Sequence, residues 1–232
     1  MHCDKLREQA YGFTHTRMSP LVDEGLDDII FPASQYAHDW MHDLFVIGVF
    51  NVVVWLFFRD VKADGVRDLY GRFHEYVKLW HLPGTIKHDG AALSRIFERK
   101  REIANDHAKA FKCQASEGLS LLPILALYAV AVLARAGIAT LACSALSRLA
   151  DVVDIIVSSG ADVAAQTVAL RDSVAGFLNA CVAAGWGDYM TPKFHWLIHL
   201  PRHLARWGCL LSCFVHERKH RMVKRYSYSI QH

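Results

Sequence analysis

The pentapeptide His216-Glu217-Arg218-Lys219-His220 has the residue types and the spacing of a zinc peptidase motif. On a helix, two histidines four residues apart share a face and bind one metal, while the glutamate between them activates a metal-bound water. Two features argue against this chemistry. Arg218 and Lys219 place positive charges beside a dication, and no Asp, Glu or Cys follows His220 as a third ligand. A zinc hydrolase is therefore an alternative interpretation of this segment.

A structural zinc site is a second way to use the same region. Its candidate ligands are Cys209, Cys213, His216 and His220. A helix rises ~1.5 Å per residue, so the outer two would lie roughly 16 Å apart on a straight helix. Bonds to zinc are about 2 Å long. The site would need a chain break near Gly208 or Ser212, and we expect the two cysteines to be small apolar core residues instead.

The C-terminal part of the chain is strongly basic. Residues 190–232 carry a net charge of +7, with Glu217 as their single acid, whereas residues 1–189 carry −4. This asymmetry favours a polyanionic partner, and phosphate is the commonest one. Basic side chains interleaved with Trp196 and Trp207 suit phosphate and base-stacking contacts. We predict that DNA is contacted by Lys193, Arg202, Arg206, Arg218, Lys219, Arg221, Lys224 and Arg225. A solvated basic helix is the alternative.

Three histidines precede the basic helix at a regular spacing. His195, His199 and His203 repeat every four residues, as one face of a helix would. We expect them to pack and form hydrogen bonds beside Trp196 and Trp207.

A second polar cluster stands in front of an apolar run near the N-terminal end. Asp39, His42 and Asp43 lie within about one helical turn, directly before the apolar residues 44–58. Asp39 shares a helical face with either of the other two. The alternative to a functional role is an N-cap, in which one aspartate accepts hydrogen bonds from free backbone N–H groups and suits the helix dipole.

The elements that must position these residues are helices. Apolar periodicity and breaks at Gly and Pro predict a mainly all-α fold. The expected helices cover residues 36–59, 66–80, 91–115, 118–135, 138–158 and 162–184, with a helical turn at 202–207 and a longer helix over 211–226. Residues 1–34 look irregular, with a remnant strand near residues 28–33. We divide the chain into residues 1–35, a helical body over 36–189, and a basic C-terminal helical module over 190–232.

Two apolar runs raise the question of a membrane. The run over 44–58 is short and contains Asn51, and the run over 121–146 is interrupted by Arg135. A membrane-spanning helix needs about 20 apolar residues, and an arginine near its middle costs several kcal/mol. We expect buried helices and no membrane, with a membrane-associated helical protein as the alternative. The scattered cysteines and the lack of an apolar signal region favour free thiols in a reducing compartment.

Three segments together resemble eukaryotic cut-and-paste transposases of the CACTA-like and related groups. Asp39-Trp40-Met41-His42 is similar to that family's D-x-x-H element, which precedes an apolar helix. Residues 112–125 resemble its mid-domain segment. Residues 191–227 resemble its P-K-x-H-x-L-x-H-x-P segment, followed by an acid in a basic helix, and this match is the most specific. The resemblance spans about residues 35–227.

The resemblance implies a fold and a site. In that family a long helical insertion interrupts an RNase H-like core before its last acidic residue. The helices from about 60 to 185 would be this insertion, with a partial RNase H-like remnant at the two ends. Glu217 would match the last member of an Asp-Asp-Glu set that holds Mg²⁺ for strand cleavage. Asp39 and His42 would support the core or its DNA contacts, and the protein would act in the nucleus.

The chain departs from the family pattern at its N-terminal end. The first two catalytic aspartates of the family lie upstream of the D-x-x-H element. Here Asp4, Asp23, Asp27 and Asp28 are the acids upstream, and none has a recognisable setting. We therefore expect a C-terminal transposase fragment that binds DNA but does not cut it alone. It would use Mg²⁺ only in a completed site, supplied by an intact transposase or a second copy.

Overall fold

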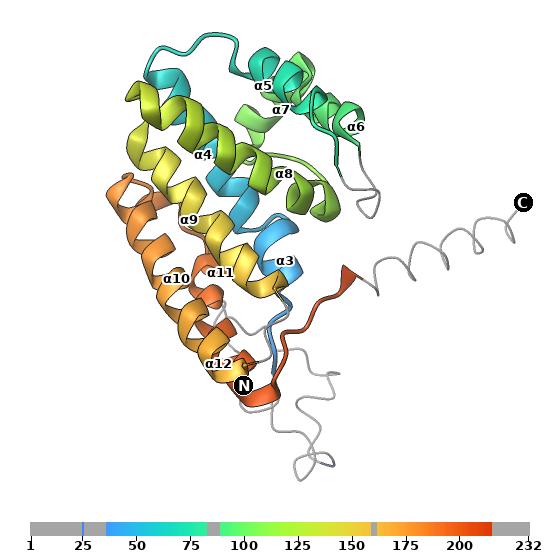
Figure 1. The fold of residues 1–232 in the computed structure, drawn as a ribbon, viewed down its shortest axis with the longest axis vertical. Coiled ribbons are helices and arrows are strands. Elements are labelled where there is room, and N and C mark those ends of the chain that lie inside the picture. The colour runs from blue at the N-terminus through green and yellow to red at the C-terminus, as the bar shows by residue number, and fades with distance from the viewer. Residues whose placement is uncertain (1–24, 26–35, 83–88, 159–161, 215–232) are drawn as a thin grey trace, which may run out of the picture. The chain divides into compact units, whose positions relative to one another are not determined.

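The computed structural model describes residues 25, 36–82, 89–158 and 162–214. Backbone contacts divide the chain after Ala37, and the fold described here is that of the second unit, His38–His232. Its described residues form helices and no strand; their only β-type pairing is an isolated bridge between Asp39 and Leu211 (Figure 1). The prediction of a mainly all-α fold is confirmed. The expected strand at 28–33 lies outside the described residues.

The polar cluster and the first apolar run form two helices, α3 (Trp40–Phe45) and α4 (Val49–Ala63). The single helix predicted over 36–59 is wrong, because the chain turns sharply at Ile47, which has a φ of 49°. Asn51 stabilises the turn, since its Oδ1 accepts a hydrogen bond of 2.8 Å from the backbone N of Gly48. Asn51, the polar residue inside the apolar run, thus stabilises the N-terminal end of α4.

Helix α4 is the buried centre of the unit. Most of its side chains are inaccessible to solvent, as the apolar composition predicted. Asn51 is buried too, and its Nδ2 donates a 2.7 Å hydrogen bond to the backbone O of Phe111. At the other end of the helix, Asp60 accepts a 2.7 Å hydrogen bond from Nε1 of the buried Trp186. The buried amide of Asn51 and the buried indole N–H of Trp186 therefore both have partners, as buried polar groups require.

Short helices close one end of the unit: α5 (Leu69–Lys78), α6 (Gly90–Ser94) and α7 (Arg99–Ala108). The continuous helix predicted over 91–115 is wrong. A 3₁₀ turn at Arg95–Phe97 and an extended Glu98 separate α6 from α7. The interruption turns Phe97 into the core, where its ring stacks with those of Phe58 and Phe73 at centroid distances of 6.1 and 5.6 Å. Burial of aromatic surface outweighs helix continuity here.

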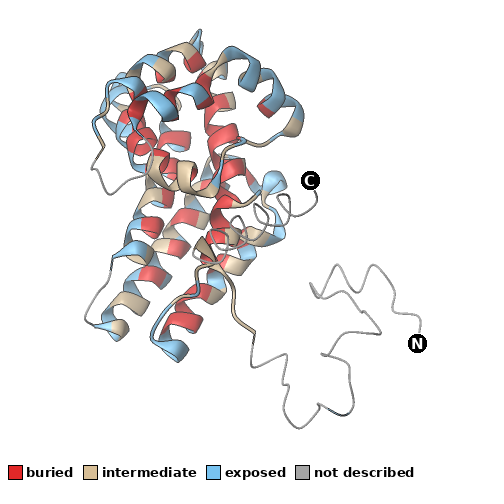
Figure 2. Ribbon diagram, turned by 90° about the vertical axis from the view of Figure 1, so that its right-hand side faces the viewer, coloured by how far each residue is buried: buried red, intermediate tan, exposed pale blue. Residues whose placement is uncertain are grey.

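Three long helices lie side by side along the unit: α8 (Ala115–Tyr128), α9 (Thr140–Val157) and α10 (Val163–Ala183) (Figure 1). They agree with the helices predicted over 118–135, 138–158 and 162–184. Helix α8 continues through a π-helical turn (Ala129–Leu133) and a 3₁₀ turn (Ala134–Ala136). Their inner faces carry the buried residues of the core (Figure 2).

Two helical stretches are long and apolar enough to cross a membrane by length and composition: Trp40–Ala63, which covers α3 and α4, and Ala115–Ala136, which begins with α8. In the first, 72% of the most apolar window is buried inside the protein, against 39% in the second. The first therefore has the burial of a core helix, and the second presents an apolar outer face.

The chain then returns along the long helices through α11 (Pro192–Trp196), a 3₁₀ turn (Leu197–His199) and α12 (Leu200–Trp207). Helix α12 packs on α10 and α11 packs on α3. Helix α12 ends at Gly208, whose φ of 68° suits glycine.

The helix predicted over 211–226 does not begin at Leu211, which pairs with Asp39 instead; residues 215–226 lie outside the described residues. The described part of the segment predicted as a separate module, 190–214, packs on helices of the same unit.

Candidate functional site where two remote segments meet

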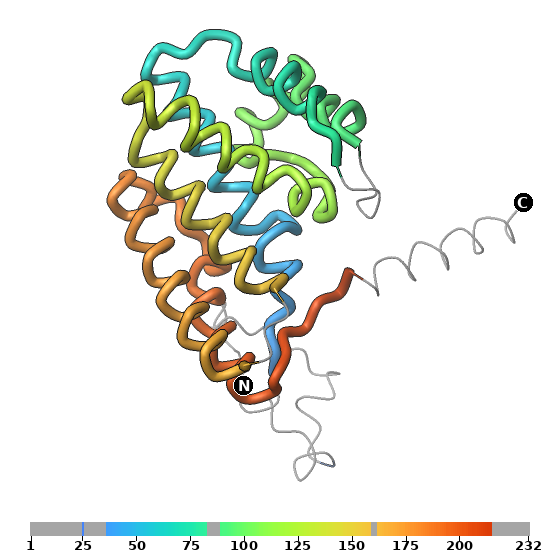
Figure 3. The backbone as a smooth tube through the Cα atoms, viewed as in Figure 1, coloured from blue at the N-terminus to red at the C-terminus, as the bar shows by residue number. Residues whose placement is uncertain are grey.

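The D-x-x-H element and residues 211–213 of the 191–227 segment lie side by side. Asp39 and Leu211 form a parallel bridge, and the backbone N of Trp40 donates a 3.2 Å hydrogen bond to the backbone O of Leu211. Figure 3 shows the two stretches of backbone running together. We call this region, residues 38–46 with 193–213, the junction. It brings together the two segments that carry the family resemblance most clearly.

Asp39 is the centre of the junction. Its Oδ1 accepts hydrogen bonds from the backbone N of Met41 (3.0 Å) and of Cys213 (3.2 Å), and its Oδ2 pairs with Nδ1 of His42. Burial opposes ionisation of this carboxyl, but the hydrogen bonds from His42 and Cys213 outweigh it and lower its pKa. The N-cap interpretation is confirmed for Asp39, which caps α3. The bond to Cys213 goes beyond a cap.

A cysteine completes a set of metal-ligand atoms around Asp39. One ligand atom from each of Asp39, His42 and Cys213 lies within 4.8 Å of the other two. The sequence had suggested Cys213 together with Cys209, as two core residues or two zinc ligands. Cys209 is exposed, so the expectation that it is a core residue is wrong. The structural zinc site stays a prediction, because His216 and His220 lie outside the described residues.

Lys193 holds α11 against the end of α3. Its Nζ donates hydrogen bonds to the backbone O atoms of His42 (2.8 Å) and Val46 (2.7 Å). A cation beside the last carbonyls of a helix also suits the helix dipole. Burial lowers the pKa of this ammonium, and the carboxylate of Asp43 opposes the shift. The structure thus gives Lys193 a role inside the protein in place of the expected phosphate contact.

Asp43 is a buried acid next to these groups. Its side chain is 4% exposed, and its Oδ2 lies 3.7 Å from Nδ1 of His38. Within the described residues that oxygen has no hydrogen-bond partner. Burial raises the pKa of Asp43 to about 7, against the opposing charge of Lys193. The carboxyl is therefore poised between its neutral and charged forms near neutral pH.

Two of the three regularly spaced histidines, His199 and His203, pack on a fourth, His38, and His195 packs on His199. His38 stacks on Trp196, His199 and His203, with ring centroids 5.2, 5.6 and 5.4 Å apart. Its backbone N also donates a 3.2 Å hydrogen bond to Nδ1 of His203. Burial, followed by the neighbouring histidines, lowers the pKa of His38 to about 4. The sequence reasoning missed His38, although its position directly before Asp39 places it at the start of the same helix.

The expected packing and hydrogen bonding between His195 and His199 are present, but the ring on Trp196 is that of His38, and Trp207 has another neighbour. The guanidinium of Arg206 lies 4.9 Å from the centroid of the Trp207 ring, and this ring is 48% exposed. Arg202 and Arg206 are exposed on α12. A cation and an aromatic face open to solvent are the side chains that stack on bases and bind phosphates.

The remaining predicted site residues cannot be described in the same way. Glu217 and the basic residues Arg218, Lys219, Arg221, Lys224 and Arg225 lie outside the described residues, as do the histidines of the HERKH motif. The magnesium site, the zinc hydrolase and most of the phosphate contacts stay predictions.

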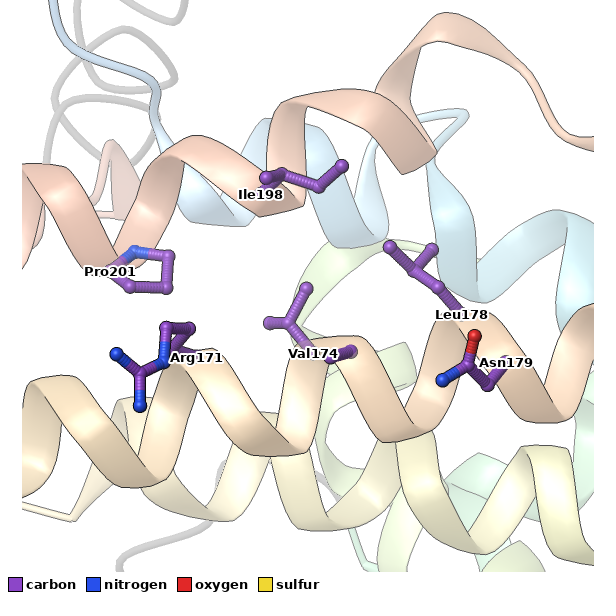
Figure 4. A pocket seen from close by; sticks show the side chains of 7 residues that line it. Arg171, Val174, Leu178, Asn179, Ile198 and Pro201 are labelled. Atoms are coloured by element: carbon purple, nitrogen blue, oxygen red, sulfur yellow. The ribbon is translucent and has the colours of Figure 1, made fainter.

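A shallow groove separates α10 from the 3₁₀ turn and α12 that follow it (Figure 4). Val174 and Leu178 of α10 face Ile198 and Pro201 across it, with Arg171 and Asn179 beside them. Its lining is mostly apolar and contains no pair of titratable side chains. We assign no chemistry to this groove, and the junction remains the candidate site.

Comparison of the chain with protein-family models, with curated proteins and with solved structures gave no match. The resemblance to CACTA-like transposases therefore rests on the motifs named above.

Proposed function

We propose that the chain is a transposase-derived protein that binds DNA through its basic C-terminal part and whose nuclease site is incomplete. The observation that carries the proposal is the hydrogen bond from the backbone N of Cys213 to Oδ1 of Asp39, between residues 174 positions apart. It joins the D-x-x-H element to the segment that leads to Glu217, which follows Cys213 by four residues.

The helical body supports this proposal. In the family, a helical insertion separates the D-x-x-H element from the last acid of one catalytic core. An insertion of this kind must begin and end at neighbouring points, because the core it interrupts is continuous. The helices from about 60 to 185, which the resemblance assigns to the insertion, begin and end at neighbouring points, because Nε1 of Trp186 donates a 2.7 Å hydrogen bond to Oδ2 of Asp60. The geometry is that expected of an insertion.

The electrostatics support a nucleic-acid partner. Arg202, Arg206 and Trp207 are exposed near the C-terminal end of the described chain, and five further basic residues follow in the sequence. Such a surface gains affinity mainly by releasing counterions from phosphates, so it binds DNA without strong sequence preference. Action in the nucleus, with an intact transposase or a second copy as partner, is part of the proposal.

Magnesium does not fit the described residues of the junction. Mg²⁺ prefers several oxygen ligands in an octahedral arrangement. The ligand atoms grouped with Asp39 are a histidine nitrogen and a cysteine sulfur, and Asp43 lies beside Lys193 and Asp39 in a buried setting. We derive no step through Mg²⁺ here. In the proposal, Glu217 would contribute to a magnesium site only if further carboxylates completed it.

DNA binding can be measured by fluorescence anisotropy with a labelled duplex at increasing salt. We expect the affinity to fall about 10³-fold or more between 50 and 200 mM salt. The double variant Arg202→Gln/Arg206→Gln should bind more weakly and lower the salt slope by about 1.8. Arg171→Gln, which removes an exposed arginine from α10, is the matched control and should change neither. No binding at 50 mM salt would refute the proposal.

The incomplete nuclease site needs its own assay. Supercoiled plasmid incubated with the chain and Mg²⁺ should stay intact. Nicking that disappears in Glu217→Gln would show that the chain supplies the missing carboxylates itself.

A further inference from the structure

The junction holds three side chains of the kinds that bind transition metals. Asp39, His42 and Cys213, which we call the junction triad, each place one ligand atom within 4.8 Å of the other two. We propose that the junction triad binds a zinc-class transition-metal ion that ties the start of α3 to residues 211–213. This inference goes beyond the proposed function and does not depend on DNA binding.

The ligand types determine the class of metal. Zinc is bound by cysteine sulfur at about 2.3 Å, and by histidine nitrogen and aspartate oxygen at about 2.0–2.2 Å. In a tetrahedral site these bonds place neighbouring ligand atoms about 3.3–3.8 Å apart. Atoms that all lie within 4.8 Å of one another need only small side-chain movements to reach that geometry. A thiolate ligand selects zinc or a similar soft cation over magnesium and calcium.

The backbone arranges the triad without any metal. Asp39 is fixed as the cap of α3, and His42 follows on the same helical face. Cys213 is held by its own backbone N, which donates to Asp39, and by the neighbouring bridge between Leu211 and Asp39. The backbone around the three ligands is therefore already ordered before the metal binds, so binding costs little further conformational entropy. Preorganisation of this kind raises affinity.

The surroundings of the triad suit a metal that stabilises structure. Trp40 and Phe214, each adjacent in sequence to a triad residue, pack with ring centroids 5.6 Å apart. The site itself is partly open to solvent, since the side chains of His42 and Asp39 are 39% and 16% exposed, so a metal ion can reach it. The fourth position of a tetrahedral site would hold water.

This site differs from both zinc sites suggested by the sequence. The peptidase motif uses His216, Glu217 and His220, and the structural zinc set uses Cys209, Cys213, His216 and His220. The junction triad instead combines one residue of that region, Cys213, with two residues from the other end of the unit. Each site therefore loses its metal in different variants.

The test uses the full chain, purified without a polyhistidine tag and loaded with Zn²⁺ or Co²⁺. We expect one metal per chain after dialysis. The Co²⁺ form should show visible bands of a tetrahedral site and a near-ultraviolet band from charge transfer between thiolate and metal. The wild-type spectrum is decisive even if a variant fails to fold: absence of bound metal, or Co²⁺ without a thiolate band, would overturn the proposal.

Variants then locate the ion. Cys213→Ser and His42→Asn should each weaken metal binding at least tenfold, a loss that even removal of an outer-shell partner can cause. The matched control, Cys209→Ser, should retain the metal and the thiolate band. Metal that persists in Cys213→Ser and disappears in His220→Ala would assign the ion to the peptidase motif and refute the junction triad.

Discussion

Asp39 bonds to more groups than a helix cap requires, and its substitution tests whether the additional bonds matter. Asp39→Ala removes the cap of α3 together with the bonds to His42 and to the backbone N of Cys213. Loss of a cap costs about 0.5–2 kcal/mol, and an unpaired buried donor adds about 1–3 kcal/mol. We expect the free energy of unfolding to fall by about 2–4 kcal/mol, measured by urea denaturation in EDTA.

Asp162 provides the comparison, because it caps α10 and, among the described residues, its side chain accepts bonds from the backbone N atoms of Ala164 and Ala165 alone. Asp162→Ala should therefore cost only the cap, about 0.5–2 kcal/mol. Equal losses in the two variants would show that the bonds from Asp39 to His42 and Cys213 contribute nothing to stability.

His203 makes stability depend on pH. Burial, and then the charges of His199, Arg202 and Arg206, lower its pKa in the folded protein; His38 also packs on its ring. The unfolded pKa of histidine is about 6.5, so between the two values the unfolded chain binds more protons. Stability should therefore fall as the pH drops below about 6.5, and it should level off below the folded pKa.

Urea denaturation between pH 7.5 and 5 in EDTA measures this effect. In His203→Gln the decrease in the free energy of unfolding over that range should be smaller than in the wild type. His107→Gln, an exposed site on α7, should leave the decrease unchanged. A His203 variant with the full wild-type decrease would mean that other groups are responsible.

At the scale of the elements, the turn between α3 and α4 sets the position of the junction. A β-carbon at Gly48 would meet the backbone O of Asp43 and would lie 2.6 Å from the carbonyl carbon of Leu44. Because these are backbone atoms, they cannot rotate away. Gly48→Ala should lower the free energy of unfolding by about 1–3 kcal/mol, as overpacking does, and should weaken metal binding at the triad.

Gly187→Ala is the matched control for this turn, since a β-carbon there meets nothing within 4 Å. Thermal unfolding followed by circular dichroism compares the two variants. A melting temperature of Gly48→Ala equal to that of the control would show that the turn can relax.

The sequence predicts best the helices whose two ends are set by residues close to them in the sequence. Residues 138–158 and 162–184 have long apolar periodicity between glycines, and α9 and α10 match them closely. The helices over 36–59 and 91–115 were predicted as continuous, because neither contains a proline and their breaks have distant causes. Asn51 caps a turn and also bonds to Phe111, and Phe97 leaves the helix to enter an aromatic core.

In the candidate site, too, some contacts could be predicted from local sequence and others could not. The cap at Asp39 follows from local spacing, so the sequence predicts it. The approach of Cys213 to Asp39 and of Lys193 to Val46 depends on the path of all the helices between them. Periodicity in one sequence carries no information about that path, and the pairing could be expected only from the family resemblance.

At the scale of the whole molecule, the outer face of Ala115–Ala136 is the feature that separates a protein in water from one on a membrane. Only 39% of its most apolar window is buried, and Val130 is 46% exposed while its neighbour Ala129 is fully buried. We expect this face to contact water, because single exposed apolar residues are common on soluble proteins. Val130→Lys should then change the free energy of unfolding by no more than about 0.5 kcal/mol.

The same face can be tested directly with lipid vesicles. In sedimentation with vesicles, the wild type and Val130→Lys should both stay in the supernatant without detergent. Ala129→Lys is the positive control for disruption, because it buries a charge and should unfold the protein.

If the face instead lay in a bilayer, the wild type would sediment with the vesicles. A lysine at position 130 would then cost about 2.5–3.5 kcal/mol at the bilayer centre and release the protein. That outcome would favour the membrane-associated alternative over a DNA-binding protein.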